Sequence, residues 1–446
     1  MRGRWAARRT TSVPVDANPR PRHLKPPSPG LQTSVPRILR ADVAPPRSRP
    51  TAWVLYAEPV IGILGIAVAM STFAAVSAIA NTAPNDFTVF LESARWLRQG
   101  ADPYQPPLRP GPGYNLNPPA AVLLFVPFSF LPDSIALAVW TALAIGAYVL
   151  AAHWIAREVM PGRTVSIAGA IFLSQPAIMS LLLGQIGGLM MLLLTAAWIA
   201  DRRERPLAAG ALLGIAIGAK PFLLIFAAYA LWRRSAAFAS GLAAGIAGMV
   251  TLGVAAAGVA GFRSWVGAIE QITWSAHVAN ASLLALLTRT LSVTPDILHA
   301  TPLTVRPDLV QPLWWTSVAI VGATTAVILL RARNRDQAWA ILLIASLLVS
   351  PLGWVYYATM FVGPLLAVAM KAPRSAQVVI AVGSACLNVP PMSMPSLGRA
   401  GVLVFGSIYA WGFLLLFAGV AVSDRRSANR TVQPRPPSAT NVASPP

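Results

Sequence analysis

Charged side chains are scarce in this chain. Only 11% of its 446 residues are Asp, Glu, Lys or Arg, while 55% are hydrophobic and the mean hydropathy is +0.60. A soluble domain usually carries about 25% charged residues. The apolar residues form long blocks such as 53–80, 134–156, 236–260 and 399–422. Because a helix of about 20 apolar residues spans the hydrocarbon core, the composition excludes a water-soluble globule and predicts an all-α polytopic membrane bundle.

Cysteine and histidine are also scarce. Cys386 is the single cysteine, which excludes an internal disulfide and a site made of several thiolates. Four histidines, at 23, 153, 277 and 299, are scattered and match no zinc spacing. We therefore expect neither a bound metal nor a cofactor.

Basic residues outnumber acidic ones by 35 to 15, for a net charge of +20. They gather at the ends of apolar segments, as the positive-inside rule expects, and form no stripe of the kind that binds nucleic acid. Residues 1–50 are rich in Arg and Pro and predict a disordered basic cytoplasmic arm. The polar residues 424–446 predict a disordered cytoplasmic tail, which leaves 51–423 as the transmembrane domain. With both ends in the cytoplasm, the number of crossings is even.

The order of apolar segments and basic connectors predicts about twelve transmembrane helices. Apolar segments lie near 53–80, 117–132, 134–156, 164–200, 206–232, 236–260, 313–330, 337–350, 353–370, 376–390 and 399–422. We expect 164–200 to cross once, broken at Pro176, and 206–232 to form two short helices around Lys220-Pro221. The basic connectors are Arg202 to Arg205, Arg233-Arg234, Arg331 to Arg335 and Lys371 to Arg374. This arrangement puts all of them inside, whereas two crossings in 164–200 with one in 206–232 would put Arg202 to Arg205 outside. Two long loops, 81–117 and 261–312, then face outward.

The first outward loop holds the densest group of polar residues. Asp86 follows the first apolar segment, at the start of a stretch that predicts an amphipathic helix in the outer interface or one packed on the bundle. A carboxylate at such a boundary is partly desolvated, which raises its pKa and suits it to abstract a hydroxyl proton. Capping of the following helix is the alternative role for Asp86. The loop continues with Gly100-Ala101-Asp102-Pro103-Tyr104 and Tyr114-Asn115-Leu116-Asn117-Pro118-Pro119.

These motifs, in this order, resemble glycosyltransferase family 87, whose members have the GT-C fold. The resemblance covers roughly residues 53–422, and each motif is weak alone. It rests on Asp86-Phe87, Gly100, Asp102-Pro103-Tyr104, Tyr114, Pro118-Pro119, Pro127, Leu131-Pro132, Gly184-Gln185, Lys220-Pro221, Asn280-x-Ser282-Leu283, Arg289 and Ser350-Pro351-x-x-Trp354-x-Tyr356-Tyr357.

The resemblance implies an inverting glycosyltransferase at the periplasmic side of the cell membrane. It would move a sugar, mannose by default, from a polyprenyl-phosphate co-substrate to a glycan or glycolipid. Asp86 would be the general base. Lys220 and Arg289 would bind the donor phosphate, although a snorkelling lysine and a solvated loop arginine are the plainer roles. Candidate sugar or acceptor contacts, which could equally join helices or anchor the interface, are Tyr114, Gln185, Asn280, Trp354 and Tyr357.

Other functions stay open at this stage. Many mannosyl members of the family have a histidine where this chain has Tyr356, and the pair Tyr356-Tyr357 is typical of the arabinofuranosyl branch. A membrane transporter or lipid flippase would show inverted repeats and charges at mid-membrane, and this sequence shows no repeat. A non-catalytic scaffold would tolerate replacement of Asp86.

Overall fold

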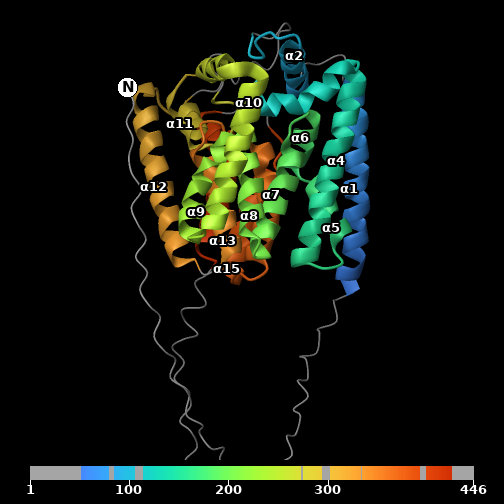
Figure 1. Cartoon of the computed structure of the whole chain (residues 1–446). Coiled ribbons are helices and arrows are strands. Elements are labelled where there is room, and N and C mark those ends of the chain that lie inside the picture. The colour runs from blue at the N-terminus through green and yellow to red at the C-terminus, as the bar shows by residue number, and fades with distance from the viewer. Residues whose placement is uncertain are drawn as a thin grey trace, which may run out of the picture. The chain divides into compact units, whose positions relative to one another are not determined.

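The computed structural model describes residues 52–79, 85–105, 114–272, 275–293, 302–332, 334–391 and 398–423. The predicted terminal arm and tail lie outside these residues. Within them the regular structure is helical, with one isolated bridge between Asn280 and Trp354, which confirms the all-α prediction (Figure 1). In chain order the elements are α1 (Ala52–Ile79), α2 (Asp86–Arg98), α3 (Pro119–Val122), η1 (Leu123–Phe130), α4 (Asp133–Val159), α5 (Thr164–Phe172), α6 (Gln175–Leu182), α7 (Gly187–Arg202), α8 (Pro206–Ala219), η2 (Pro221–Phe226), α9 (Ala227–Arg233), α10 (Ala236–Glu270), α11 (Leu283–Leu291), η3 (Pro307–Leu309), α12 (Val310–Arg331), α13 (Arg335–Val349), η4 (Val355–Phe361), α14 (Val362–Ala369), α15 (Arg374–Leu387), α16 (Arg399–Val404) and α17 (Ile408–Ala421).

Four of the described helical stretches are long and apolar enough to cross a membrane. They are Glu58–Ala78, Asp133–Val159, Ala236–Glu270 and Pro307–Arg331. A fifth span arises if α5 and α6, bent by 65° at their junction, are taken as one broken helix. The protein is therefore a membrane protein. The count of twelve crossings includes helices of 10–17 residues and stays a prediction.

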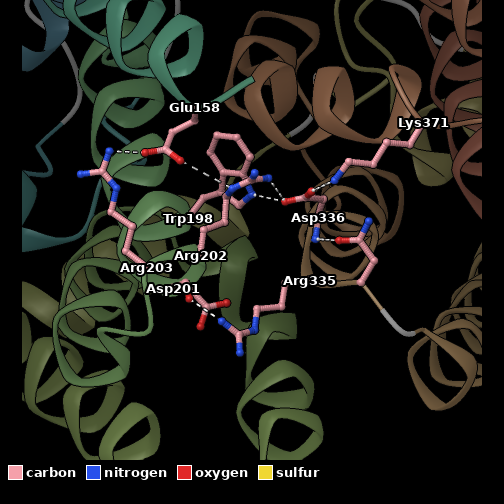
Figure 2. A network of polar contacts seen from close by, with 9 residues as sticks. Glu158, Trp198, Asp201, Arg202, Arg203, Arg335, Asp336 and Lys371 are labelled. Carbon is pink, nitrogen blue, oxygen red and sulfur yellow. Dashed lines mark hydrogen bonds and ion pairs between the residues drawn. The ribbon is translucent and has the colours of Figure 1, made fainter. Parts of the chain in front are cut away.

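One end of the bundle is held by ion pairs, and we call it the basic end (Figure 2). Asp336, at the start of α13, accepts hydrogen bonds from Trp198 and Arg202 of α7, and Lys371 lies 3.3 Å from the same carboxylate. Arg203 pairs with Glu158 near the end of α4. These contacts show that four segments distant in sequence meet at one end.

A second buried carboxylate completes the basic end. Asp201 accepts hydrogen bonds from the Tyr229 hydroxyl, from Trp339 Nε1 at 3.1 Å and from Arg233 Nε at 3.3 Å. Its backbone carbonyl also accepts from Arg335 at 2.6 Å. Arg202, Arg233, Arg335 and Lys371 thus lie together, as the connector pattern predicted.

The opposite end carries α2, and we call it the α2 end. The prediction that 117–132 crosses the membrane is wrong, because α3 and η1 stay at this end. The Tyr104 hydroxyl donates to the Asn117 carbonyl at 2.7 Å, and Arg98 donates to the Ser129 carbonyl at 3.2 Å, so both ends of the segment lie beside α2. Twelve helical residues reach only about 18–24 Å. Pro119 begins this stretch, Pro127 lies inside it and Pro132 follows it.

The prediction that 164–200 crosses once is also wrong. α5 begins just after the end of α4 at the basic end, and Leu183, which follows α6, accepts a hydrogen bond from Phe87 of α2 at 3.2 Å. α7 then runs back to Arg202. The segment passes between the two ends twice, with its first pass bent between α5 and α6. The segment 164–200 therefore makes one crossing more than expected, and 117–132 makes one fewer. The total is unchanged, so the basic connectors still lie at one end.

The segment 206–232 folds as expected. α8 leaves the basic end, the chain breaks at Lys220-Pro221, and η2 with α9 returns to Arg233. α8 packs closely on α10 through small residues: a Cβ added to Gly214 would lie 2.4 Å from the Leu242 carbonyl oxygen. Glycine allows this backbone approach, which fixes the helix that ends in Lys220.

Candidate active site

The first residue of α2 is Asp86, a half-buried carboxylate at the α2 end. It does not cap its helix. Asn85 is the cap, because its Oδ1 accepts from the Thr88 amide at 3.0 Å. The Asp86 side chain is therefore left for other contacts, and the capping role considered for it belongs to its neighbour.

A tight turn between α6 and α7 lies against the start of α2. Gly184 has φ of +65°, a conformation that side chains rarely adopt, and a Cβ there would lie 2.5 Å from the Phe87 Cβ. Trp140 Nε1 donates to the Gly184 carbonyl at 2.9 Å. These contacts, with the bond from Phe87 to Leu183, fix the direction of the next residue, Gln185.

Gln185 joins two functional groups from different helices. Its Nε2 donates to Asp86 Oδ2, and its Oε1 accepts from the Tyr357 hydroxyl at 3.2 Å. Because a carboxylate only accepts, the two bonds fix which way the amide points. Tyr357 is buried in η4, the short 3₁₀ helix that follows the turn after α13. The carboxylate, the amide and the phenol therefore form one chain of hydrogen bonds.

Lys220 completes the group from the break between α8 and η2. Its Nζ lies 5.0 Å from the centre of the Tyr357 ring, within the range of a cation–π contact. Phe222 packs against the same ring at a centroid distance of 5.5 Å. As a whole residue, Lys220 is half-buried.

The electrostatics of Asp86 reflect this setting. Burial raises the pKa of the carboxyl from its ordinary 3.8 to about 6, against the opposing effects of the Gln185 hydrogen bond and the Lys220 charge. A carboxylate with such a pKa is mostly ionised at neutral pH and more basic than an ordinary aspartate. That combination suits a general base.

The side chain of Asn280 is occupied by backbone contacts. Its Nδ2 donates to the carbonyls of Ser275 and Pro351, and its Oδ1 accepts from the amides of Ser282 and Gly353. All its hydrogen-bonding positions are taken by backbone. The side chain joins the loop before α11 to the turn after α13. It has no hydrogen-bonding position left for a sugar.

Arg289 is engaged through Nε and Nη1, while its Nη2 has no hydrogen-bond partner among the described residues. It is 1% exposed on α11, and its guanidinium donates to the carbonyls of Ala276, His277 and Asn280 and to the Ser407 hydroxyl. Burial lowers its pKa to about 9, which leaves it charged at neutral pH. These contacts make Arg289 an organiser of its loop, and the structure does not bring it to the Asp86 group.

The remaining aromatic candidates are Trp354 and Tyr114. Trp354 stacks on Tyr356 at a centroid distance of 5.7 Å, and the ring of His277 meets it edge-on at 5.8 Å. Tyr114 is half-buried at the start of the segment leading to α3. Asp102, the second acid in the loop, is exposed, and its Oδ1 accepts from the Tyr104 amide at 3.0 Å, which makes it a turn residue.

The sequence did not single out Trp140 or Phe222, which hold the Gly184 turn and the Tyr357 ring. Both lie in long apolar segments, where an aromatic residue that supports a site cannot be told from one that faces lipid. Asp86, Gln185, Lys220 and Tyr357 were all candidates, and they come together from α2, the α6–α7 turn, the α8 end and η4.

Comparison with known proteins identifies one family. A family model described as "Glycosyltransferase family 87" matches residues 115–351, just over half of the chain. Gln185 and Lys220 lie within the matched stretch, whereas Asp86 precedes it and Tyr357 follows it. A search of curated proteins finds no match.

Among solved structures, the crystal structure of ArnT from Cupriavidus metallidurans in the apo state is similar to this chain. The identity is 15% and the TM-score 0.35, over 84% of this chain and 80% of that chain. A TM-score this low supports no conclusion about function.

Proposed function

Because the chain belongs to glycosyltransferase family 87, we propose that it transfers a sugar from a polyprenyl phosphate to a glycan or glycolipid, with mannose as the default donor sugar. The observation that carries the proposal is the meeting of Asp86, Gln185, Tyr357 and Lys220 at the α2 end. A base and a cation from different helices are the two groups that such a transfer needs.

Asp86 is the general base. In the proposed step it takes the proton of an acceptor hydroxyl, and the hydroxyl oxygen attacks the anomeric carbon of the donor sugar. The bond from that carbon to the phosphate oxygen breaks, its electron pair leaves with the polyprenyl phosphate, and the configuration inverts. Gln185 holds one oxygen of the carboxylate, which leaves the other for the proton.

Lys220 stabilises the phosphate as its negative charge grows. An ammonium among apolar and aromatic neighbours acts strongly because little water competes with it. The ring of Tyr357 on one side keeps the cation in place. A lipid-borne phosphate suits this position, since its isoprenoid can stay in the membrane while the phosphate reaches the end of the bundle.

The positive-inside rule supports an orientation for the reaction. The basic end, with Arg202, Arg233, Arg335 and Lys371, belongs in the cytoplasm, so the α2 end faces the periplasm or cell exterior. In this orientation the donor is used on the far side of the membrane.

The test is transfer by purified protein in membranes with polyprenyl-phosphate mannose and polyprenyl-phosphate arabinofuranose offered separately. Asp86→Asn should lower kcat by about 10²–10⁴-fold, the usual contribution of a general base. Asp102→Asn, the matched control in the same loop, should retain activity because Asp102 is an exposed turn residue. If Asp86→Asn turned over as fast as wild type, Asp86 would not be the general base. Transfer of arabinofuranose alone would place the chain in the arabinofuranosyl branch, and no transfer of either sugar would favour a transporter.

A further inference from the structure

Two buried asparagines stand in the segment that leads into α3. Asn115 and Asn117 are 2% and 1% exposed. Asn115 Oδ1 accepts from the Asn117 backbone amide at 2.9 Å and from Asn117 Nδ2 at 2.9 Å. Because a backbone amide can only donate, this turn fixes the orientation of both side-chain amides.

The fixed orientation leaves one donor and one acceptor unused. Within the described part of the chain, neither Asn115 Nδ2 nor Asn117 Oδ1 has a hydrogen-bond partner. A buried polar group without a partner costs about 1–3 kcal/mol, so native structures seldom retain one unless a ligand or an ordered water satisfies it. A sugar hydroxyl can do so, since it accepts from an NH₂ group and donates to a carbonyl oxygen.

The segment is held firmly from both sides. Tyr104 donates its hydroxyl to the Asn117 carbonyl at 2.7 Å, and Trp265 of α10 donates from Nε1 to the Leu116 carbonyl at 3.1 Å. The free amide groups are thus carried on a rigid piece of backbone. Rigid placement is what a polar group needs to select a ligand.

This segment also lies near the end of α8 that carries Lys220. A Cβ added to Gly253 of α10 would lie 3.1 Å from the Ala120 amide of α3, and one added to Gly218 of α8 would lie 2.3 Å from the Met249 Cβ. Met249 and Gly253 are one turn apart on α10, or about 6 Å. The start of α3, which directly follows the asparagines, and the end of α8 that leads into Lys220 therefore pack against neighbouring turns of α10.

We infer that Asn115 and Asn117 form a subsite that binds hydroxyl groups of the donor sugar, whose phosphate lies at Lys220. The inference rests on the proposed function and adds to it a site for the sugar itself. Asn115 Nδ2 donates to a ring hydroxyl and Asn117 Oδ1 accepts from one, so the pair recognises the sugar and not the lipid.

The test measures binding of two short-chain probes, polyprenyl-phosphate mannose and bare polyprenyl phosphate, to full-length protein in nanodiscs. Asn115→Ser removes Nδ2 without adding charge, and its hydroxyl can still accept from the Asn117 amide. This variant should bind the mannose-bearing probe about tenfold more weakly, as expected for one lost hydrogen bond, and should bind the bare probe unchanged. Lys220→Met should weaken both. The control Asn388→Ser alters an exposed asparagine whose side chain contacts Gln175 and Ser384, and it should weaken neither.

Deoxymannose versions of the probe extend the test to the unaltered protein. At least one deoxymannose probe should bind wild type about tenfold more weakly than the mannose probe does. The same two probes should bind Asn115→Ser with equal affinity. If Asn115→Ser binds both original probes like wild type, the pair holds an ordered water only and the inference is overturned. If Asn115→Ser loses affinity for both probes equally, the inference is overturned too. The asparagine pair would then stabilise the fold and would not bind the sugar. If wild type binds neither probe and transfers nothing, the proposed function itself fails, and the subsite with it.

Discussion

Gln185 donates a hydrogen bond to Asp86, 99 residues earlier in the chain, and accepts one from Tyr357, 172 residues later. One amide therefore links the start of α2 to η4. A carboxylate held at one oxygen keeps the other in a constant direction, which is the property that a general base needs.

Transfer should depend on pH through Asp86. Its pKa is raised to about 6 by burial, and only the ionised form can accept a proton. The kcat/KM for the donor, which reports the free enzyme, should therefore rise as the pH increases through about 6. A rate profile between pH 4.5 and 8.5 measures this. The residual rate of Asp86→Asn should lack the same inflection, and a flat profile for wild type would contradict the assignment.

Replacing Gln185 with Leu should move that inflection. The hydrogen bond from Gln185 lowers the pKa of Asp86, so its loss should shift the acid limb of the profile to higher pH and reduce kcat. The KM for the donor should change little, because the amide acts through the base. Gln377→Leu is the control, since Gln377 is an exposed amide that donates to the Ala369 carbonyl on α14. An unshifted profile in Gln185→Leu would show that the hydrogen bond does not govern the carboxylate.

Gly184→Ala should disturb the site through the backbone. The left-handed φ of +65° costs a non-glycine residue about 1–3 kcal/mol, and the new Cβ would meet Phe87 at 2.5 Å. We expect a lower unfolding temperature together with a loss of kcat, as Gln185 moves away from Asp86. Gly146→Ala in α4 has open space around its Cβ and should leave both unchanged or raise stability slightly. Normal activity in Gly184→Ala would mean that the turn can shift without cost.

Asp201→Leu should destabilise the basic end strongly. The change leaves Tyr229, Trp339 and Arg233 without their shared acceptor, and breaking a buried charged pair on one side costs roughly 3–5 kcal/mol. Thermal unfolding in detergent measures the effect. Glu204→Gln, which removes an exposed partner of Arg233 and Arg335, should change little. Similar unfolding temperatures for the two variants would rule out a special role for the buried carboxylate.

Thiol labelling can test the orientation of the two ends. Cys386 is the single cysteine, so Cys386→Ala gives a background without thiols. Asp102→Cys at the α2 end should react with an impermeant reagent added outside intact cells. Arg203→Cys, whose native side chain is 52% exposed at the basic end, should react only after the membrane is opened. The reverse pattern would put the proposed active site in the cytoplasm.

The sequence alone determined the features that depend on local composition. Long apolar blocks give helices because lipid offers no partner for the backbone, and prolines mark several of the breaks, as at Pro176 and Lys220-Pro221. It also identified Asp86 as a candidate base, because a carboxylate directly after an apolar segment is expected to be partly desolvated. The gathering of Arg202, Arg233, Arg335 and Lys371 at one end followed from the same charge pattern.

Only the tertiary structure decided which segments pass between the two ends and which side chains meet. Apolar content is the same for a short span and for a helix packed on one end, so 117–132 and 164–200 were both assigned wrongly. The bonds of Gln185 to Asp86 and Tyr357 join residues about 100 to 170 positions apart, and no local pattern reports them. The sequence singled out Asn280 and Arg289 as candidate binding residues, and only the structure shows the backbone groups that they contact. A polar side chain can use the same atoms to bind backbone or a substrate, so the sequence cannot distinguish the two.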